Sequence, residues 1–584
     1  MNLSEKLNAA CAAAFEKAGY DPALGKVNVS NRPDLCEYQC NGAMAAAKTY
    51  HCAPIQIAQK VVEFLKEDET FAKAEAVMPG FINLDLSEKF LIDNAVRMAE
   101  TEKFGLDLPE EKTVIIDYGG PNVAKPLHIG HLRPAIIGES VKRILHYMGQ
   151  HTIGDIHLGD WGLQFGLIIE ELKHRKPDLC YFDPSYTGEY PSEPPFTLSE
   201  LEEIYPYASA KSKEDEAYLA AAHENTYKLQ HGDRAYEAIW KHIAAVSIPD
   251  LKRNYDDLKV YFDLWKGESD AKPFIGELVE TLEKQGLSYV SNGATVVDVK
   301  EESDTRDVPP CLIMKSDGAF LYQTTDLATI IDRMRSYDPQ EMIYITDKRQ
   351  ELHFTQVFRV AKKAGLVHED TKLVHIGFGT MNGKDGKPFK TRSGGVMRLE
   401  YLISEVNDAV REKMKARYEE DEVDEATVKQ VGLAAIKYGD LSNQASKDYN
   451  FDIDRFASFE GNTGPYILYT IVRIKSILRR SGASVSPADI AALPLGNAGL
   501  KALLKVLAGF SDMMQTAFDE LAPHKICSYI YQLSDAFNSF YHDTQILKEE
   551  DSVIRNAYLS LLDLCRSVLE TCIDMLGFDA PEKM

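Results

Sequence analysis

The sequence lacks the features that mark membrane, secreted and fibrous proteins. No apolar stretch approaches the ~20 residues that a membrane span needs, and the first residues do not form a basic region followed by an apolar core. The 9 cysteines have no framework spacing, and their odd number predicts reduced thiols. Internal repeats and low-complexity tracts are also missing. We therefore expect a cytoplasmic, globular protein that does not bind membranes.

Positive charge is in short supply. Lys and Arg number 65 against 90 Asp and Glu, which gives a net charge of −25. A nucleic-acid partner normally leaves a basic footprint, so the average charge argues against one. Average charge does not describe a local groove, however, and Lys and Arg cluster within residues 473–480. A nucleic-acid partner therefore stays open at this point.

The length of 584 residues predicts several domains. Short alternating apolar runs and an Ala-rich helical start fill the first part of the chain, helical periodicity dominates beyond about residue 400, and a Pro/Tyr/Glu-rich stretch interrupts the middle. These shifts predict a small N-terminal α/β domain at 1–110, a nucleotide-fold domain at 111–395 with an insertion at about 175–300, a helical linker at 396–455, and an α-helical bundle at 456–584.

The nucleotide-fold domain is expected to be a doubly wound parallel sheet of the Rossmann type. A β-branched run at 113–117 leads through a Gly/Pro/Asn loop into a helical segment, and a second strand follows at 151–158. Strand patterns resume at 341–346 and 372–377, after the insertion. Such sheets bind ligands at the carboxyl ends of their strands, so we expect the site there.

Two imidazoles lie three residues apart where the first strand feeds its helix. His128 and His131 flank Gly130 in a loop that starts at Asp117. Exposed N–H groups at a helix start favour an anion, two histidines can donate to phosphoryl oxygens, and the glycine admits a flat base. The alternative is that both histidines only cap the helix.

A second candidate segment follows the last strand of the same sheet. Residues 383–395 form a Gly-rich stretch with four cations: Lys384, Lys387, Lys390 and Arg392. A cationic loop can stabilise the charge that builds on a leaving pyrophosphate. The alternative is a solvated turn.

These two segments resemble the signatures of class I aminoacyl-tRNA synthetases. HIGH at 128–131 and the later KPFKTRSGG carry the resemblance. It narrows to the arginyl-tRNA synthetase family because further runs match in the same order: PNVAKPLHIGHLRP, GDWGLQFG, LYQTTDLA, DKRQELHF and SFEGNTGPYILYTIVRI.

The resemblance implies an arginine–tRNA ligase that forms arginyl-adenylate and pyrophosphate before it transfers arginine to the terminal ribose. The implied substrates and partners are ATP with Mg²⁺, L-arginine and tRNA(Arg). It further implies a monomer without a structural metal, in which bound tRNA is required for activation.

The family pattern also assigns candidate site residues. The implied catalytic groups are His128, His131, Lys125, Lys390 and Arg392. The implied ATP contacts are His128, Gly130, His131, Gly159, Asp160, Lys387 and Lys390. The implied arginine contacts are Asp117, Gly120, Asn122, His131, Tyr322, Asp326 and Gln350.

One departure from the class pattern concerns the cationic loop. The class loop normally reads Lys-Met-Ser-Lys-Ser, whereas this chain has Phe-Lys-Thr-Arg and lacks the second lysine. The family substitutes a lysine just before HIGH, and Lys125 lies there. Which of Lys125, Lys390 and Arg392 contacts the β- and γ-phosphates is left open.

Side-chain chemistry independently favours Tyr322 and Asp326 as the arginine pocket. A guanidinium is planar and always charged, so a carboxylate with a hydroxyl or aromatic partner suits it. Their spacing of four places both on one face of a helix start. The alternatives are an aspartate that complements a helix dipole and a half-buried strand tyrosine.

Tyr466, Tyr469 and Arg473 are the candidate tRNA-binding residues. They mix aromatic and basic groups at helical spacing, which suits stacking on unpaired bases and contact with the backbone. The family places an anticodon-binding domain here and a tRNA-corner contact in the N-terminal domain. The alternative is a salt-bridged amphipathic helix.

Other sites and functions are disfavoured. Cys36, Cys40, His51 and Cys52 do not have the spacing of four tetrahedral zinc ligands, so we expect buried thiols. A small-molecule nucleotidyltransferase would not need the C-terminal helices. A silent RNA-binding paralogue would have lost the phosphate-binding cations.

Overall fold

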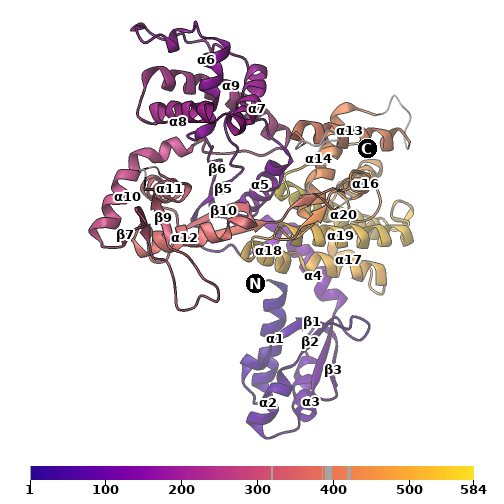
Figure 1. Cartoon of the computed structure of the whole chain (residues 1–584). Coiled ribbons are helices and arrows are strands. Elements are labelled where there is room, and N and C mark those ends of the chain that lie inside the picture. The colour runs from indigo at the N-terminus through magenta and orange to yellow at the C-terminus, as the bar shows by residue number, and fades with distance from the viewer. Residues whose placement is uncertain (1, 317, 319, 384–385, 388–396, 417–422) are drawn as a thin grey trace.

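The structure is a computed structural model that describes residues 2–316, 318, 320–383, 386–387, 397–416 and 423–584. No helix in these ranges combines the length and the apolar character that a membrane crossing requires. The N-terminal domain and the helices of the insertion lie at opposite ends of the molecule, with the parallel sheet and the C-terminal helices between them (Figure 1).

The N-terminal domain is an antiparallel sheet covered by helices. The sheet has the order β1-β2-β4-β3, and its strands are β1 (Val27–Val29), β2 (Tyr38–Cys40), β3 (Phe71–Val77) and β4 (Phe81–Leu86). The covering helices are α1 (Leu3–Lys17), α2 (Gly42–Tyr50) and α3 (Pro54–Leu65). The next helix, α4 (Glu88–Glu100), packs against the C-terminal helices instead (Figure 1). Asn2 and Glu5 cap the start of α1 reciprocally, and the buried Leu7, Cys11 and Phe15 give this helix its apolar face.

The central sheet is fully parallel, with the order β11-β10-β5-β6. Its strands are β5 (Thr113–Tyr118), β6 (His151–Asp155), β10 (Glu341–Asp347) and β11 (Lys372–Phe378), and the helices α5 (Leu132–Tyr147) and α12 (Glu351–Lys363) connect them. Buried Ile115 and Ile116 show that both faces of β5 are covered, as expected for a parallel sheet. The predicted fold class, a doubly wound α/β domain between a small α/β domain and a helical bundle, is confirmed.

The second strand ends three residues before the expected position. The backbone of Ile156 and Leu158 donates to Leu264 and Lys266, so the chain leaves the sheet at Asp155 to pair with a segment in the middle of the insertion. His157, between them, has a φ of 41°. This departure brings the middle of the insertion to the carboxyl edge of the sheet.

The segment between β6 and β10 forms two units. The first is helical: α6 (Leu163–Arg175), α7 (Leu198–Glu214), α8 (Glu216–Gln230) and α9 (Arg234–Asp257). The second contains α10 (Lys272–Lys284), an antiparallel sheet of β7 (Ser288–Ser291), β8 (Ala294–Val297) and β9 (Cys311–Met314), and α11 (Tyr322–Tyr337). Because β8 pairs with β9, this small sheet continues past residue 300, the expected end of the insertion.

The C-terminal part is helical, with one two-residue strand pair. Its helices are α13 (Leu399–Lys415), α14 (Glu425–Leu441), α15 (Ile453–Phe456), α16 (Gly464–Ser481), α17 (Ala498–Ala508), α18 (Phe510–Asp519), α19 (Pro523–Asp543) and α20 (Ser552–Met575). The pair joins β12 (Met381–Asn382) to β13 (Tyr449–Asn450) in parallel.

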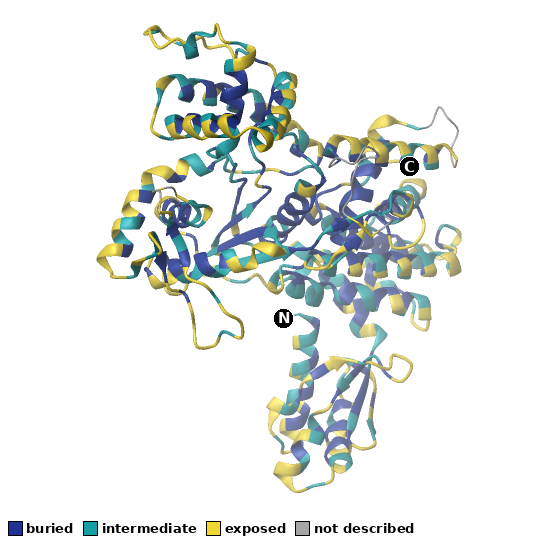
Figure 2. Cartoon of the chain, in the orientation of Figure 1, coloured by how far each residue is buried: buried dark blue, intermediate teal, exposed yellow. Residues whose placement is uncertain are grey.

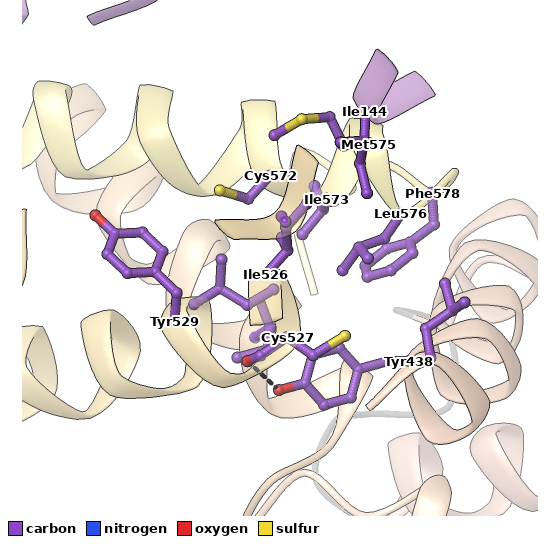
Figure 3. Packing of buried hydrophobic residues seen from close by; sticks show 14 of the residues in the cluster. Ile144, Tyr438, Ile526, Cys527, Tyr529, Cys572, Ile573, Met575, Leu576 and Phe578 are labelled. Carbon is purple, nitrogen blue, oxygen red and sulfur yellow. Dashed lines mark hydrogen bonds between the residues drawn. The ribbon is translucent and has the colours of Figure 1, made fainter. Parts of the chain in front are cut away.

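The central sheet and the C-terminal helices share one hydrophobic core. The buried residues concentrate where α5 meets α14, α19 and α20 (Figure 2). Ile144 of α5 packs in the same cluster as Tyr438, Ile526 and Ile573, and the Tyr438 hydroxyl donates to the Cys527 carbonyl at 2.9 Å (Figure 3). Because α5 follows the histidine turn directly, the helical domain supports the candidate site through this core.

Candidate active site

A cavity of about 500 Å³ lies at the carboxyl edge of the parallel sheet. It is bounded by the ends of β5, β10 and β11 and by the start of α5. Several predicted site residues line it together: Asp117, Gly120, His128, Gly130, His131 and Gln350. A larger cavity, of about 670 Å³, opens at the amino edge beside Val114 and Lys372 and holds none of the predicted residues. The carboxyl edge is where doubly wound sheets bind ligands.

The two histidines close a tight turn, η3 (Ile129–His131), in front of α5. The Gly130 N–H donates to Nδ1 of His128 at 3.0 Å, and the His128 N–H donates to Nδ1 of His131 at 3.1 Å. Because each Nδ1 accepts a hydrogen bond, each neutral ring carries its proton on Nε2. The histidines therefore do cap the helix, and the cap fixes the tautomer that leaves an Nε2–H donor on each ring.

Both imidazoles are held neutral. Burial lowers the pKa of His128, and Lys125 lowers it further. Burial, followed by the repulsion that a protonated His128 ring would add and by the charge of Lys125, lowers the pKa of His131 to about 3. The ring centroids are 4.0 Å apart, so two protonated rings would repel strongly. The pair therefore offers hydrogen-bond donors without a fixed positive charge.

The segment that carries the predicted cationic loop is anchored beside this turn. Before the loop in the sequence, Met381 lines the cavity. After it, the Met397 carbonyl accepts from the Ile129 N–H at 3.1 Å, and the Leu399 N–H donates to the Leu127 carbonyl at 3.0 Å. Lys387 is exposed. Lys384, Lys390 and Arg392 lie outside the described residues.

Four predicted site residues do not line the cavity: Lys125, Asn122, Gly159 and Asp160. The Lys125 ammonium sits 4.7 Å from the ring centroid of Tyr205, which belongs to α7. The backbones of residues 121–123 pair with Gly159, and a Cβ on Gly159 would come within 2.5 Å of Asn122 Oδ1. Asp160 is buried and accepts from the Ser269 N–H and hydroxyl at 2.9 and 2.6 Å.

Tyr322 and Asp326 lie one turn apart on α11, beyond the cavity lining. The Tyr322 residue is 68% exposed, whereas the Asp326 carboxylate pairs with Nε2 of His353 at 2.5 Å. Burial raises the pKa of Tyr344, and the carboxylates of Asp117 and Asp326 both raise it further. Asp326 therefore acts on the same buried ring as the cavity residue Asp117.

Glu268 is an acidic residue that the sequence reasoning missed. Burial raises the pKa of its carboxyl group to about 7, with further contributions from Asp160 and Asp326. It begins η5 (Glu268–Ala271), between the two units of the insertion, and its N–H donates to the Leu158 carbonyl at 3.0 Å. No motif marks it in the sequence; the pairing of this segment with the chain after β6 brings it to the site.

Asp155 and Arg333 were also missed, although the sequence holds a signal for both. Asp155 ends β6 in register with Asp117 at the end of β5. Arg333 lies seven residues after Asp326 on α11, hence on the same helix face. Its Nη2 contacts Asp117 Oδ2 at 2.5 Å and Asp155 Oδ2 at 2.6 Å.

Within the described ranges one group of three side chains has the donor types of a metal site. Ligand atoms of Asp117, Asp155 and His157 lie within 4.8 Å of one another. The Arg333 guanidinium already pairs with both carboxylates, so the chain supplies the cation here itself. The four residues weighed for zinc include Cys36 and Cys40, which are buried, and Cys52, which is partly exposed; all 9 cysteines are free thiols.

Tyr466, Tyr469 and Arg473 form one cluster on α16. Arg473 donates to the Tyr469 hydroxyl at 3.0 Å and to Asn538 Oδ1 at 2.7 Å, and Asn538 donates to the Tyr466 hydroxyl at 3.0 Å. Lys475 instead pairs with Glu570 and Glu582, as in the salt-bridged alternative. The structure thus brings the three predicted residues together.

Family models match most of the chain. The model for the catalytic domain of class I (R) tRNA synthetases matches residues 94–453. The DALR anticodon-binding domain matches 467–584, and the arginyl-tRNA synthetase N-terminal domain matches 1–86.

Individual relatives agree over their full length. An arginine–tRNA ligase of Agathobacter rectalis is 59% identical, with 98% of each chain covered, and one of Alkaliphilus oremlandii is 54% identical, with 100% of each covered. The crystal structure of the Plasmodium falciparum arginyl-tRNA synthetase matches 100% of this chain and 99% of its own with a TM-score of 0.82 and 25% identity. The Thermus thermophilus arginyl-tRNA synthetase has the same fold, with a TM-score of 0.79, 23% identity and 100% of each chain covered. The chain therefore belongs to the arginyl-tRNA synthetase family.

Proposed function

We propose that this aminoacyl-tRNA ligase activates L-arginine with ATP in the carboxyl-edge cavity and then transfers it to the terminal ribose of tRNA(Arg). The observation that carries the proposal is the neutral histidine pair, whose Nε2–H donors belong to the same cavity as Asp117 and Gln350. Phosphoryl oxygens and a cationic amino acid need these two kinds of group side by side.

In the first step the arginine carboxylate attacks the α-phosphorus of ATP, and pyrophosphate leaves. His128 and His131 donate to phosphoryl oxygens, and Gly130 leaves room for the adenosine beside the turn. Positioning of the two reactants and stabilisation of the developing charge account for the acceleration. Lys125, Lys387, Lys390 and Arg392 are the proposed cations for the phosphates, and Gly159 and Asp160 the proposed supports of the nucleotide. Mg²⁺ accompanies ATP because its phosphates carry dense charge.

The amino acid is proposed to lie across the floor of the cavity. Asn122, Gly120, His131 and Gln350 hold its α-amino and α-carboxylate groups. The guanidinium lies toward an acidic side made of Asp117, Tyr322, Asp326 and Glu268. Asp117 and Asp326 both act on Tyr344, and Glu268 acts on Tyr322. Their negative charge and hydroxyl suit a planar cation.

In the second step the terminal ribose hydroxyl of tRNA attacks the anhydride carbonyl carbon, AMP leaves and the hydroxyl proton is released. Tyr466, Tyr469 and Arg473 are the proposed anticodon contacts. The N-terminal domain is proposed to contact the tRNA corner, and residues 396–455 the stem. We also propose that the protein acts as a cytoplasmic monomer without a structural metal.

Amino-acid-dependent pyrophosphate exchange, with and without tRNA, tests the proposal. Each of the common amino acids is supplied in turn with ATP and labelled pyrophosphate. Exchange with arginine alone, dependent on tRNA, is the expected result. Exchange with another amino acid, or exchange that His128→Ala and His131→Ala leave unchanged, would contradict the assigned site.

A further inference from the structure

The layer directly beneath the cavity lining, which we call the floor, contains a guanidinium that belongs to the chain itself, because Arg333 pairs with the lining residue Asp117. The side chain of Arg333 is 1% exposed, and its Nη2 lies between the Oδ2 atoms of Asp117 and Asp155, at 2.5 and 2.6 Å. The guanidinium carbon is 5.3 Å from the ring centroid of Tyr344, so the aromatic face fixes its position from one side. A cation with the shape of the substrate side chain is therefore built into the substrate floor.

The two carboxylates differ in what they can reach. The Asp117 side chain is 14% exposed and lines the cavity, whereas the Asp155 side chain is 1% exposed and does not. Arg333 contacts the same Oδ2 atom of each group through a single nitrogen. The other oxygen of Asp117 therefore takes no part in this ion pair.

The hydrogen bonding of this floor is incomplete. Arg333 Nε and Nη1 are buried without a partner, and so are both ring nitrogens of His157. Buried polar atoms without partners cost stability, and a floor selected only for stability would pair them. The pKa of Asp117 is raised overall by burial and by Asp155, while Arg333 and His157 oppose that rise. Arg333 thereby favours the ionised form of Asp117.

The charges of this group do not cancel. Two carboxylates face one guanidinium, so the formal charges of the group sum to one negative charge beneath the cavity. We propose that Arg333 and Asp155 are specificity-determining residues, which hold Asp117 in place and keep the floor singly negative, so that a cationic amino acid side chain is preferred over a neutral one of the same shape. The inference deepens the proposed function and rests on it.

Asp155→Asn tests the charge without changing the cavity lining. The variant removes one negative charge from a side chain that does not reach the cavity and keeps its size. We expect the KM for arginine in pyrophosphate exchange to rise about tenfold, because one charge acts through a partly desolvated region. The KM for ATP and the inhibition constant of citrulline, the neutral urea analogue of arginine, should stay within about twofold.

The matched control is Asp304→Asn. Asp304 also forms an Asp–Arg pair in the catalytic domain, with Arg359 Nη2 at 2.6 Å, but this pair is only partly buried and Asp304 does not line the cavity. Its loss should leave the ratio between arginine and citrulline unchanged. Equal shifts for arginine and citrulline in Asp155→Asn, or a change in the Asp304→Asn ratio of the same size, would overturn the proposal and leave a structural ion pair.

A second variant covers the case in which Asp155→Asn does not fold. Arg333→Lys keeps the charge but replaces the planar fork with a point charge, so it should raise the KM for arginine through misplacement of Asp117 while the KM for ATP is unchanged. An unaltered KM for arginine in this variant would overturn the positioning role. Absence of any arginine-dependent exchange in the unmodified protein would instead contradict the proposed function itself, so the two failures are distinct.

Discussion

Arg133 and Arg333 are both almost fully buried, and each pairs with aspartate, yet the two surroundings differ in their charge balance. At the start of α5, Arg133 Nε contacts Asp440 at 2.9 Å, while its Nη1 donates to the Gly379 and Lys447 carbonyls. The positive charge of Arg133 is therefore balanced by the single negative charge of Asp440. Below the cavity, Arg333 faces two carboxylates and leaves other donors unpaired.

We call the Arg133–Asp440 pair architectural because it joins α5 to α14 with balanced charge, although Arg133 also lines the cavity, whereas Arg333 lies beneath the lining and faces two carboxylates. The Arg133 pair links α5 to α14, because Asp440 lies on α14. Asp440 also accepts from the Tyr449 hydroxyl at 2.7 Å. The neutrality of the pair suits a joint between elements. Both groups leave buried polar atoms without a partner, namely Arg333 Nε and Nη1 in one and Arg133 Nη2 and Asp440 Oδ1 in the other. The Arg333 group differs in that two carboxylates face its single cation. Buried ion pairs are weak evidence for stability by themselves, so the charge balance is the more informative quantity.

Loss of the architectural pair should produce the largest effect. Asp440→Ala leaves Arg133 buried without its counter-ion, and we expect the free energy of unfolding to fall by about 3–5 kcal/mol. Urea titration followed by circular dichroism measures it. The double variant Arg133→Met/Asp440→Leu should recover most of the loss, because both buried charges are then removed. A loss below about 1 kcal/mol in the single variant would remove the basis of the comparison.

Asp326→Asn should affect catalysis more than stability. Its carboxylate lies on the acidic side of the site, so its removal should lower kcat/KM for arginine by about 10²–10³ while the KM for ATP stays near normal. Asp338→Asn is the control. Asp338 is the C-cap residue of α11 and also pairs with a histidine, His368, at 2.8 Å. Pyrophosphate exchange with both variants measures the two losses of kcat/KM for arginine. Similar losses in the two would show that the helix, and not the pocket, is affected.

The acidic side should also give arginine binding a pH dependence. The pKa of Glu268 is raised to about 7 by burial and by Asp160 and Asp326. A bound guanidinium favours the ionised carboxylate and lowers that pKa, so binding releases a proton. Affinity should therefore weaken by up to about tenfold per pH unit as the pH falls below 7, and should level off above it.

Calorimetry in two buffers of different ionisation enthalpy measures the released proton. Glu268→Gln should abolish the release and flatten the profile, whereas wild-type binding that is independent of pH between 6 and 8 would argue against a role for this carboxyl group. His131, with a pKa of about 3, does not contribute in this range.

Some parts of this site follow from local patterns and others do not. The β-branched run 113–117, the loop and the helix after it predict β5, the histidine turn and α5, because strand and helix periods are local. Glu268 and His353 reach the site only because the chain after β6 pairs with the middle of the insertion and α12 packs beside α11. No spacing in the sequence encodes such contacts.

Asp155 is an intermediate case. Its position at the end of β6 follows from the strand pattern, but its register with Asp117 depends on which strands are neighbours in the sheet. Arg333 likewise lies on the predicted face of α11, yet its burial depends on the packing of that helix against the sheet. Local periodicity therefore identifies the face of an element, and tertiary packing decides what that face meets.

The smallest expected effect concerns a third arginine, far from the cavity. Arg473 is held by Tyr469 and Asn538, with its guanidinium carbon 4.7 Å from the Tyr469 ring centroid, and no carboxylate pairs with it among the described residues. Arg473→Ala should weaken tRNA binding by about tenfold and leave the KM for ATP unchanged. The control is Lys475→Ala. Lys475 lies two residues after Arg473 on the same helix, but it already pairs with Glu570 and Glu582, so its removal should change tRNA affinity less than about twofold. Filter binding with tRNA(Arg) measures the affinity of both variants. Equal losses of affinity would assign the effect to the general charge of α16, because an arginine without an acidic partner would then bind RNA no better than a lysine whose charge is balanced by two glutamates.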